Sequence, residues 1–427
     1  MLTQEQNELL TRVGPGTPMG ETMRRYWIPA LLAWELEVDG APVRLRVLGE
    51  DLVAFRATDG RVGILDEYCP HRATSLWLGR NEENGLRCVY HGWKFDVTGQ
   101  CVDQMNEPQQ FASKVRAVSY PAVELGGAVW IYMGPTDRQP PPPNFDWTRA
   151  TDRQRGLTKV VEDCNWLQAL EGGIDTSHAP IMHRALKSNP NQPGLTASGP
   201  FVQGGAPVLE LDTTDYGYRY FGIRKLGADR QYARGYHFVM PWTQIRPGTD
   251  GLPGAESKNT ESHGHHWVPI DDEHTMVWNW YYCFEGELGD EELDPQTSGN
   301  SFTTDIDVSD GFRARRNRSN DWQIDRAVQK TETFTGIHGV NTQDRAVQEL
   351  MGPIVDRRRE HLGPADRAII FARKLLDEAV QTVADGGDPP GVSAVYYDLR
   401  GADSVLPAEA DWREELLPLM VSGSDGR

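Results

Sequence analysis

The sequence lacks any long apolar run and any apolar, basic N-terminal segment. No stretch of about 18 consecutive apolar residues occurs, so no transmembrane helix is expected. The first residues, MLTQEQNE, have neither the basic region nor the apolar core of a secretion signal, which predicts a cytoplasmic protein. With 38% apolar and 25% charged residues the chain should be globular, and its 427 residues are enough for two domains.

Basic residues and cysteines are also scarce. Lysine and arginine number 43 against 62 acidic residues, and the formal net charge of −19 argues against binding to nucleic acid or to an anionic membrane. Five cysteines in so long a chain do not predict a disulfide framework. A reducing compartment would instead keep thiols available as metal ligands.

Two of the cysteines stand in short motifs that each also contain a histidine. Cys69 precedes His71 by two residues, and Cys88 precedes His91 by three. This is the spacing of a Rieske [2Fe–2S] site, in which two cysteines hold one iron and two histidines hold the other. The alternatives are a structural zinc site and two unrelated core histidines, but zinc ligands usually come as separate cysteine and histidine pairs. Gly92 follows the second histidine, where a tight turn around a metal needs freedom at φ.

The chain is predicted to be α+β, with a small all-β domain followed by an antiparallel sheet covered by helices. Residues 41–139 are rich in short β-like runs separated by turn residues, and four prolines from Pro140 open a connector over 140–160. Residues 161–427 form the second domain, and 1–40 should pack on it. The elements expected there are helices near 163–178 and 366–384, strands near 216–224, 235–246 and 276–284, and a surface excursion over 286–320.

A second metal site is indicated by two histidines in the first predicted helix of this domain. In an ideal helix, His178 and His183 would point roughly 140° apart and could not share a metal. Pro180 lies between them and should kink or end the helix, so that the two rings can meet. With a carboxylate they would form the facial triad of a non-haem Fe(II) site. Ordinary polar histidines at a helix end are the alternative.

Asp175 lies three residues before His178 and could accept a ring N–H from a metal-binding histidine. A helix cap or a surface acid is the alternative for this residue. Spacing alone does not select the third ligand, because the second half of the chain offers many acids: Asp321, Asp325, Asp344, Glu349, Asp356 and Asp366.

Together these motifs resemble the catalytic (alpha) subunits of Rieske non-haem iron aromatic ring-hydroxylating oxygenases of the phthalate dioxygenase type. The resemblance rests on the cluster motifs, on Asp175-x-x-His178-x4-His183, on residues 12–20 and on residues 325–357. It implies a Rieske [2Fe–2S] cluster on Cys69, His71, Cys88 and His91, and a mononuclear Fe(II) on His178, His183 and Asp344. It also implies that Asp175 links the cluster of one subunit to the iron of the next, in a homotrimer or a stacked hexamer.

No dinucleotide-binding fingerprint accompanies these motifs. The glycines of residues 14–20 follow no strand and are interrupted by prolines, which excludes a nucleotide loop. A chain that carries electrons without such a domain needs a separate reductase. The resemblance implies an NADH-dependent flavin and iron–sulfur reductase, with O2 and a small aromatic compound as substrates. A different class of function is the alternative: a pure electron-transfer protein whose second domain is inactive.

Two reactions stay open for the substrate. The first is cis-dihydroxylation of an aromatic carboxylate, and the second is monooxygenation that O-demethylates or N-dealkylates a substituted aromatic compound. Arg246, Trp242 and Phe238 are the candidate substrate contacts, since arginine can clamp a carboxylate and aromatic residues can line a pocket. Arg234 and Arg184 are further candidates for the clamp. His263, His265 and His266 are interpreted as polar residues in or beside a loop.

Overall fold

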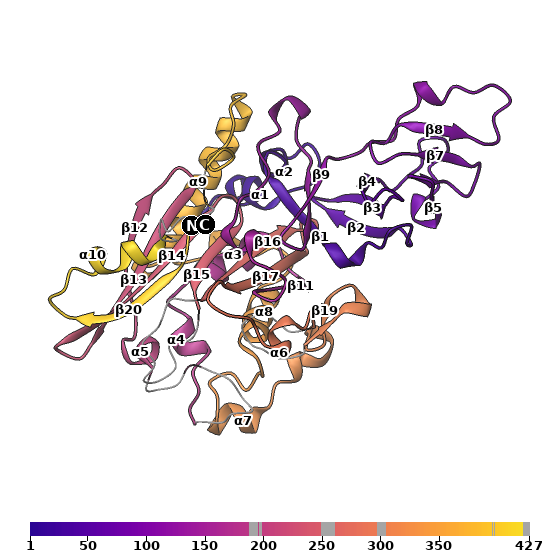
Figure 1. The fold of residues 1–427 in the computed structure, drawn as a ribbon. Helices are drawn as coiled ribbons and strands as arrows, with labels where there is room; N and C mark the ends of the chain where they lie inside the picture. Colours follow the sequence, from indigo (N-terminus) through magenta and orange to yellow (C-terminus); the bar gives the residue numbers. More distant parts are fainter. Residues whose placement is uncertain are drawn as a thin grey trace. The chain divides into compact units, whose positions relative to one another are not determined.

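The computed structural model describes residues 1–187, 195, 199–248, 261–296, 305–394, 396 and 398–421. The chain divides into two compact units. The smaller unit is Val13–Pro143, and the larger unit combines Met1–Arg12 with Asn144–Arg427. Figure 1 draws both units and labels most of their elements.

The smaller unit contains three antiparallel sheets, as expected for an all-β domain (Figure 1). Its core continues up to the sulfur-bearing side chains of Cys69 and Cys88, which are both buried. Its sheets have the orders β1-β10-β9, β2-β3-β4 and β5-β6-β7-β8. The elements are α2 (Pro18–Met23), β1 (Trp27–Leu32), β2 (Val43–Val47), β3 (Glu50–Arg56), β4 (Val62–Asp66), β5 (Arg80–Glu82), β6 (Gly85–Arg87), β7 (Trp93–Phe95), β8 (Cys101–Gln104), β9 (Ala122–Leu125) and β10 (Ala128–Tyr132).

The division differs from the predicted boundaries. Only Met1–Arg12 of the predicted segment 1–40 belongs to the larger unit, because the apolar strand β1 pairs with β10 and is buried in the smaller one. The predicted connector 140–160 is also shorter than expected. Beyond Pro143 the chain already belongs to the larger unit, and residues from Arg155 onward form the strand β11 (Arg155–Glu162) of its sheet.

The larger unit is built on one long sheet with the order β12-β13-β14-β15-β16-β17-β11-β19-β18, to which β20 adds beside β14. All pairings are antiparallel except that of β11 with β19. The strands after β11 are β12 (Val208–Thr213), β13 (Gly217–Leu226), β14 (Arg230–Val239), β15 (Thr243–Pro247), β16 (Glu261–Pro269), β17 (Thr275–Cys283), β18 (Ile306–Asp307), β19 (Arg313–Ala314) and β20 (Ala402–Pro407).

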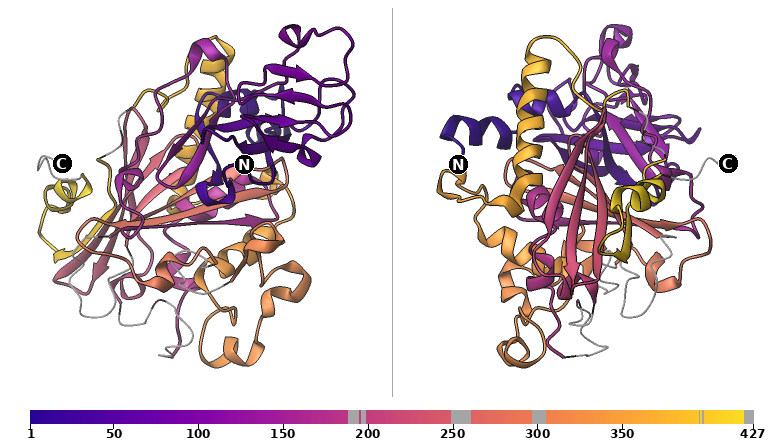
Figure 2. Two further views of the ribbon diagram at one scale, coloured as in Figure 1. Left: turned by 45° about the vertical axis from the view of Figure 1, so that its right-hand side comes forward. Right: turned by 90° about the vertical axis from the view of Figure 1, so that its left-hand side faces the viewer.

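Helices cover this sheet. Figure 2 shows α9 running along the strands, and α3 packs on β16 and on α8. Side chains alternate between the two faces of β14, so Ala233 contacts the apolar cluster around Leu416 while Tyr232 and Arg234 face the opposite side. The helices are α1 (Gln4–Thr11), α3 (Trp166–Ile174), α4 (Ala179–Met182), α5 (Pro200–Gln203), α6 (Asp290–Leu293), α7 (Arg326–Thr331), α8 (Val340–Leu350), α9 (Arg367–Ala384) and α10 (Trp412–Leu416).

Residues 286–320 were expected to be a surface excursion, and the structure corrects this in part. β19 pairs with β11 and extends the main sheet. Asp305 is fully buried and accepts hydrogen bonds from Thr342 at 2.9 Å and from Arg345 at 2.7 Å. The segment therefore anchors α8, while residues 297–304 lie outside the described part. No helix in the described residues is long and apolar enough to cross a membrane.

Candidate metal centres and cavity

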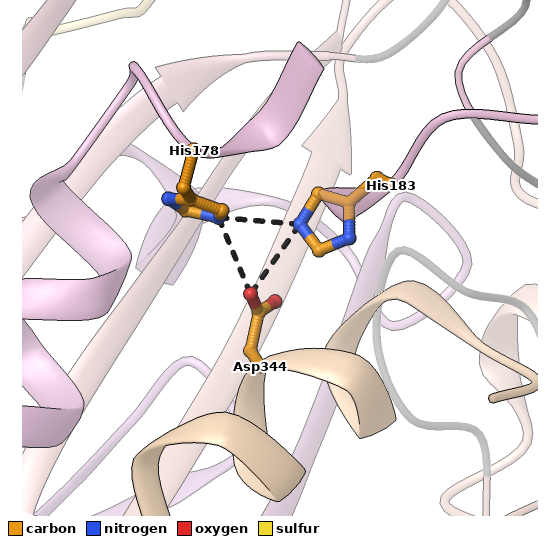
Figure 3. Close-up of side chains that lie close together, drawn as sticks. All are labelled: His178, His183 and Asp344. Atoms are coloured by element: carbon orange, nitrogen blue, oxygen red, sulfur yellow. Dashed lines mark hydrogen bonds and ion pairs between the residues drawn. The ribbon is translucent and has the colours of Figure 1, made fainter. Parts of the chain in front are cut away.

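Three side chains of the larger unit converge on one point (Figure 3). The Nε2 atoms of His178 and His183 are 3.3 Å apart, and each lies 3.3 Å from Oδ1 of Asp344. The histidines flank the short helix α4, and the aspartate projects from α8. The structure thus brings together the two histidines of the predicted facial triad and the carboxylate selected by resemblance.

The chain reaches this geometry by a break rather than by a kink at Pro180. Helix α3 ends at Ile174, and the side chain of Asp175 accepts hydrogen bonds from the backbone N–H and the hydroxyl of Ser177, both at 2.7 Å. A new helical turn then starts after His178, with Pro180 in its first turn, where a missing N–H has no cost. Because α4 is one turn long, its two flanking histidines escape the ideal helical spacing.

The hydrogen bonds on the far side of each ring fix which nitrogen faces the centre. Nδ1 of His183 lies 2.8 Å from Oε1 of Gln343, whose own amide N–H donates to the carbonyl of Ile337 at 2.8 Å. Oε1 therefore accepts, Nδ1 carries the hydrogen, and Nε2 presents a lone pair. In the same way, Nδ1 of His178 faces the acceptor Oδ2 of Asp175 at 3.3 Å, so that its Nε2 is also left to face the centre.

With both imidazoles neutral, three electron-rich atoms face each other without a donor among them, and Oδ1 of Asp344 is buried with no hydrogen-bond partner. Burial disfavours a charged imidazole, but the carboxylates of Asp175 and Asp344 outweigh burial and raise the pKa of His178 to about 10, so that a proton would bind at this point in place of a metal. The site attracts a positive charge, and two imidazoles with one carboxylate are the ligands that non-haem Fe(II) takes.

Helix α3, which precedes the histidine segment, and helix α8, which carries Asp344, are held by buried ion pairs. Glu171 on α3 lies 2.9 Å from Nη2 of Arg357 and 2.6 Å from Nε of Arg373 on α9. On α8, Arg345 pairs with the buried Asp305. Charges buried in this way need their partners, so these contacts fix the positions of both helices.

Gln343 was not singled out from the sequence, and it provides a test of the site. Replacing Gln343 with leucine removes the acceptor of the His183 Nδ1 proton, so the ring loses its fixed orientation. Iron affinity should fall by roughly 10- to 100-fold, as is usual when such a partner is lost. Anaerobic Fe(II) titration measures this. Gln348→Leu, on the same helix and also buried, should change the affinity much less; equal affinities for Gln343→Leu and wild type would contradict this role.

In the smaller unit, the two predicted loops place their histidine rings side by side. The ring centroids of His71 and His91 are 4.4 Å apart, and His71 stacks on Trp93 at 4.3 Å. Each loop closes on its cysteine: the carbonyl of Cys69 accepts from Ala73, and that of Cys88 accepts from Gly92. Gly92 has φ +74°, and a Cβ there would lie 2.7 Å from Cβ of Met105. The turn therefore requires glycine, as predicted.

The donor set of these loops fits a Rieske cluster. The Cys69 thiol donates to Cys88, which raises the pKa of Cys69 above its usual range and lowers that of Cys88 to about 6. Nδ1 of His91 is buried without a hydrogen-bond partner. Two adjacent buried sulfurs and an unsatisfied imidazole nitrogen are the groups that such a cluster binds. Each of the five cysteines is a free thiol in the structure.

A cavity of about 350 Å³ opens beside His178, His183 and Asp344, which are part of its wall. Its floor is one face of the main sheet, and the rest of its wall comes from α3, α5, α8 and the segment that carries the two histidines. The floor contributes Tyr232, Arg234, Tyr236, Gln244, Arg246, His265, Trp267, Val277 and Asn279.

Only one of the three predicted substrate contacts lines this cavity. Arg246 does, and its Nε is buried without a hydrogen-bond partner. Phe238 packs against Tyr218 in the core, and Trp242 is buried just before β15, and neither lines the cavity. Aromatic residues on strands therefore predicted the cavity wall poorly. The alternation of side chains along a strand shows which face of the sheet a residue lies on, but not how far the cavity extends along that strand.

The other two predicted arginines are engaged elsewhere. Arg234 lines the cavity but is paired with Asp403, and Arg184 donates to the carbonyl of Pro180 at 3.1 Å. His263, His265 and His266 lie within β16 rather than in a loop, and His265 faces the cavity. The alternation along this strand could have placed His265 on the same face as Trp267.

Comparison with known families agrees with both centres. A model of the Rieske [2Fe-2S] domain matches residues 26–119. A model described as LigXa C-terminal domain like matches residues 131–419. The first match covers both cysteine–histidine loops, which favours an iron–sulfur cluster over zinc.

Several curated proteins align with nearly the whole chain. The 3-chlorobenzoate-3,4-dioxygenase oxygenase subunit of Comamonas testosteroni is 38% identical, covering 96% of this chain and 97% of that protein. The phthalate 4,5-dioxygenase oxygenase subunit of Pseudomonas putida is 38% identical, covering 97% and 94%. The 5,5'-dehydrodivanillate O-demethylase oxygenase subunit of Sphingobium sp. SYK-6 is 32% identical, covering 92% and 84%.

Solved structures share the fold. Pseudomonas putida CBB5 NdmA with caffeine superposes with a TM-score of 0.62 and 18% identity, covering 88% of this chain and 96% of that one. At this identity the likeness shows the arrangement of strands and helices and no more.

Proposed function

Because the chain belongs to the Rieske aromatic ring-hydroxylating oxygenases, we propose that it uses electrons from NADH to cis-dihydroxylate an aromatic carboxylate with O2. As an oxygenase subunit it works in a multicomponent system. The electrons arrive through a flavin and iron–sulfur reductase, since neither the sequence nor the family matches include a nicotinamide domain.

In this proposal Cys69, His71, Cys88 and His91 hold the Rieske cluster, and His178, His183 and Asp344 hold mononuclear Fe(II). The observation that carries it is the convergence of two Nε2 lone pairs and one carboxylate oxygen at 3.3 Å on the wall of a cavity. When bound, the cluster supplies electrons and the iron supplies the O2 chemistry. The chain itself orients the ligands through Asp175 and Gln343.

Arg246 is the proposed clamp for the substrate carboxylate. Burial, reinforced by the neighbouring charge of Arg234, lowers the pKa of Arg246 to about 10. A carboxylate in the cavity would offset both effects and could accept two parallel hydrogen bonds from the guanidinium. Two of the relatives reported above carry the names of aromatic acids, chlorobenzoate and phthalate, which supports this choice.

The alternative is monooxygenation that O-demethylates or N-dealkylates a substituted aromatic compound. One relative that covers 92% of this chain is named as an O-demethylase, which keeps this reaction open. Both reactions need the same metals and the same reductase. They differ in where the substrate ring lies relative to the iron.

A single turnover separates the two reactions. Iron-loaded protein is reduced chemically and mixed with O2 and with benzoates that bear carboxyl, methoxy, phenoxy or N-alkyl groups. The proposal predicts a product that has gained two oxygens and two hydrogens, identified by mass. A dealkylated product with a released aldehyde would select the alternative. No oxidised product from any reduced, iron-loaded sample would contradict both.

Asp175 is proposed to carry electrons from the cluster of a neighbouring subunit in a homotrimer or a stacked hexamer. Its side chain is 17% exposed and lies 3.3 Å from His178 Nδ1, so it can reach both the ligand and a partner's surface. Asp175→Asn should keep both metals but slow reoxidation of the reduced cluster by about 10- to 100-fold. Rapid mixing with O2 and substrate measures this rate. Ser177→Ala, which leaves the contact with His178 intact, is the control; unchanged reoxidation in Asp175→Asn would exclude the role.

A further inference from the structure

A row of polar side chains crosses the cavity floor. Gln244 on β15 lies opposite His265 on β16, and His265 lies opposite Asn279 on β17. Residues directly opposite on neighbouring strands point to the same face of a sheet, and all three line the cavity. The amide of Gln244 donates to the carbonyl of Gly173 at 2.9 Å, so this end of the row is satisfied.

The other end of the row is only half satisfied. Nδ1 of His265 and Oδ1 of Asn279 form a hydrogen bond of 2.7 Å. Nδ2 of Asn279 is buried and has no hydrogen-bond partner. His265 is only partly buried, and its Nε2 has no hydrogen-bond partner in the described part of the chain either. Buried polar groups are nearly always hydrogen-bonded, so the unsatisfied Nδ2 of Asn279 on a cavity floor points to a ligand.

The two free atoms are one donor and one acceptor. In the arrangement above, Nδ1 of His265 donates to Asn279, so Nε2 has a lone pair and Nδ2 of Asn279 has the free N–H. If the amide is turned round, the other tautomer of the imidazole is required and the two roles are exchanged. In both cases the pair offers one donor and one acceptor to the cavity.

The pair is also uncharged. Burial lowers the pKa of His265 well below its usual range, and the charge of Arg246 adds to the effect. Arg246 is two residues from Gln244 on β15 and therefore lies on the same face of the sheet. It is opposite His263 of β16, as Gln244 is opposite His265. The cavity therefore presents a cation and, beside it, a neutral donor–acceptor pair. The other two arginines of its wall, Arg234 and Arg345, are paired with Asp403 and Asp305.

We propose that His265 and Asn279 form a subsite for a hydroxyl group on the substrate ring, so that the substrate is a hydroxylated aromatic carboxylate rather than a dicarboxylate. A hydroxyl group both donates and accepts, which matches the pair. A second carboxylate would place negative charge against an unprotonated acceptor, and a methoxy group could not donate. The carboxylate half of this inference rests on the proposed function, while the hydroxyl half does not.

Binding to the iron-loaded protein without O2 tests the subsite by calorimetry. The probes are meta- and para-hydroxybenzoate, the methylbenzoates with the same positions, and the corresponding dicarboxylates. Two hydrogen bonds should make a hydroxybenzoate bind at least about tenfold more tightly than its methyl analogue at one of the positions. Tighter binding of the methyl analogues or of the dicarboxylates would overturn the proposal without any variant.

Variants locate the preference. Asn279→Leu and His265→Phe should reduce the hydroxyl-to-methyl affinity ratio to about one, whereas Arg246→Met should weaken all benzoates and keep the ratio. A ratio that survives in both of the first two variants would contradict the subsite.

Phenol and toluene, which have no carboxylate, separate this inference from the proposed function. If Arg246→Met leaves benzoate binding unchanged, Arg246 is not the carboxylate clamp, but the wild-type protein should still bind phenol more tightly than toluene. Equal binding of phenol and toluene, with equal binding in the benzoate series, would overturn the subsite itself.

Discussion

Replacing Asp344 with alanine should abolish product formation while leaving the visible spectrum of the cluster unchanged. The change removes the only carboxylate of the three converging ligands and leaves two imidazoles 3.3 Å apart. The loss of turnover should exceed the roughly 10- to 100-fold that follows from losing a hydrogen-bond partner of a ligand. Product formed in a single turnover of chemically reduced protein is the measurement.

The matched control for this variant is Asp356→Ala. Asp356 was an equal candidate on spacing alone, but its side chain accepts from the backbone N–H of Arg358 and pairs with the guanidinium of the same residue at the surface. Its loss removes only these contacts and should leave turnover intact. Near wild-type turnover in Asp344→Ala, or its loss in Asp356→Ala, would show that the carboxylate ligand has been assigned to the wrong residue.

Replacing Cys88 with alanine should remove the cluster and with it all turnover that depends on a reductase. Cys88 is one of two adjacent buried cysteines. Without its thiolate, one iron of a Rieske cluster loses one of its two protein ligands. The visible absorbance and the electron paramagnetic resonance of the reduced cluster should both disappear. The mononuclear site should still bind Fe(II), because His178, His183 and Asp344 belong to the other unit.

Cys101→Ala is the control, since this cysteine is equally buried in the same unit and its thiol donates only to the carbonyl of Asp103. It should keep the spectrum of the cluster. A retained spectrum in Cys88→Ala would mean that the loops hold no Rieske cluster through this residue. Loss of Fe(II) binding in the same variant would mean that the smaller unit contributes to the second centre.

Ligands close together in the sequence could be predicted, because their geometry is set locally. Cys69 with His71, and Cys88 with His91, each share one loop, and His178 and His183 flank one helical turn. Asp344 could not be derived in this way. It lies on α8, which packs on α3 through tertiary contacts, so several acids remained equivalent until resemblance selected one.

The hydrogen-bond partners of the ligands and the residues of the cavity wall were harder to predict, for the same reason. Gln343 precedes Asp344 directly, yet only the turn of α8 and the position of α4 bring its amide to His183. Phe238 and Tyr236 share one face of β14, but the aromatic packing around Tyr218 buries the first, while the second lines the cavity. Strand periodicity predicts a face, and the helices that cover it decide which part of that face stays open.

Iron counted per chain tests the central claim most directly. Anaerobically reconstituted, desalted wild-type protein should contain about three iron atoms, two in the cluster and one at the facial triad. Asp344→Ala should lose one of them and keep the spectrum, and Cys88→Ala should lose two and keep one. Two iron atoms in wild type with no change in Asp344→Ala would contradict the account, because the chain would then carry electrons without a centre at which to use them.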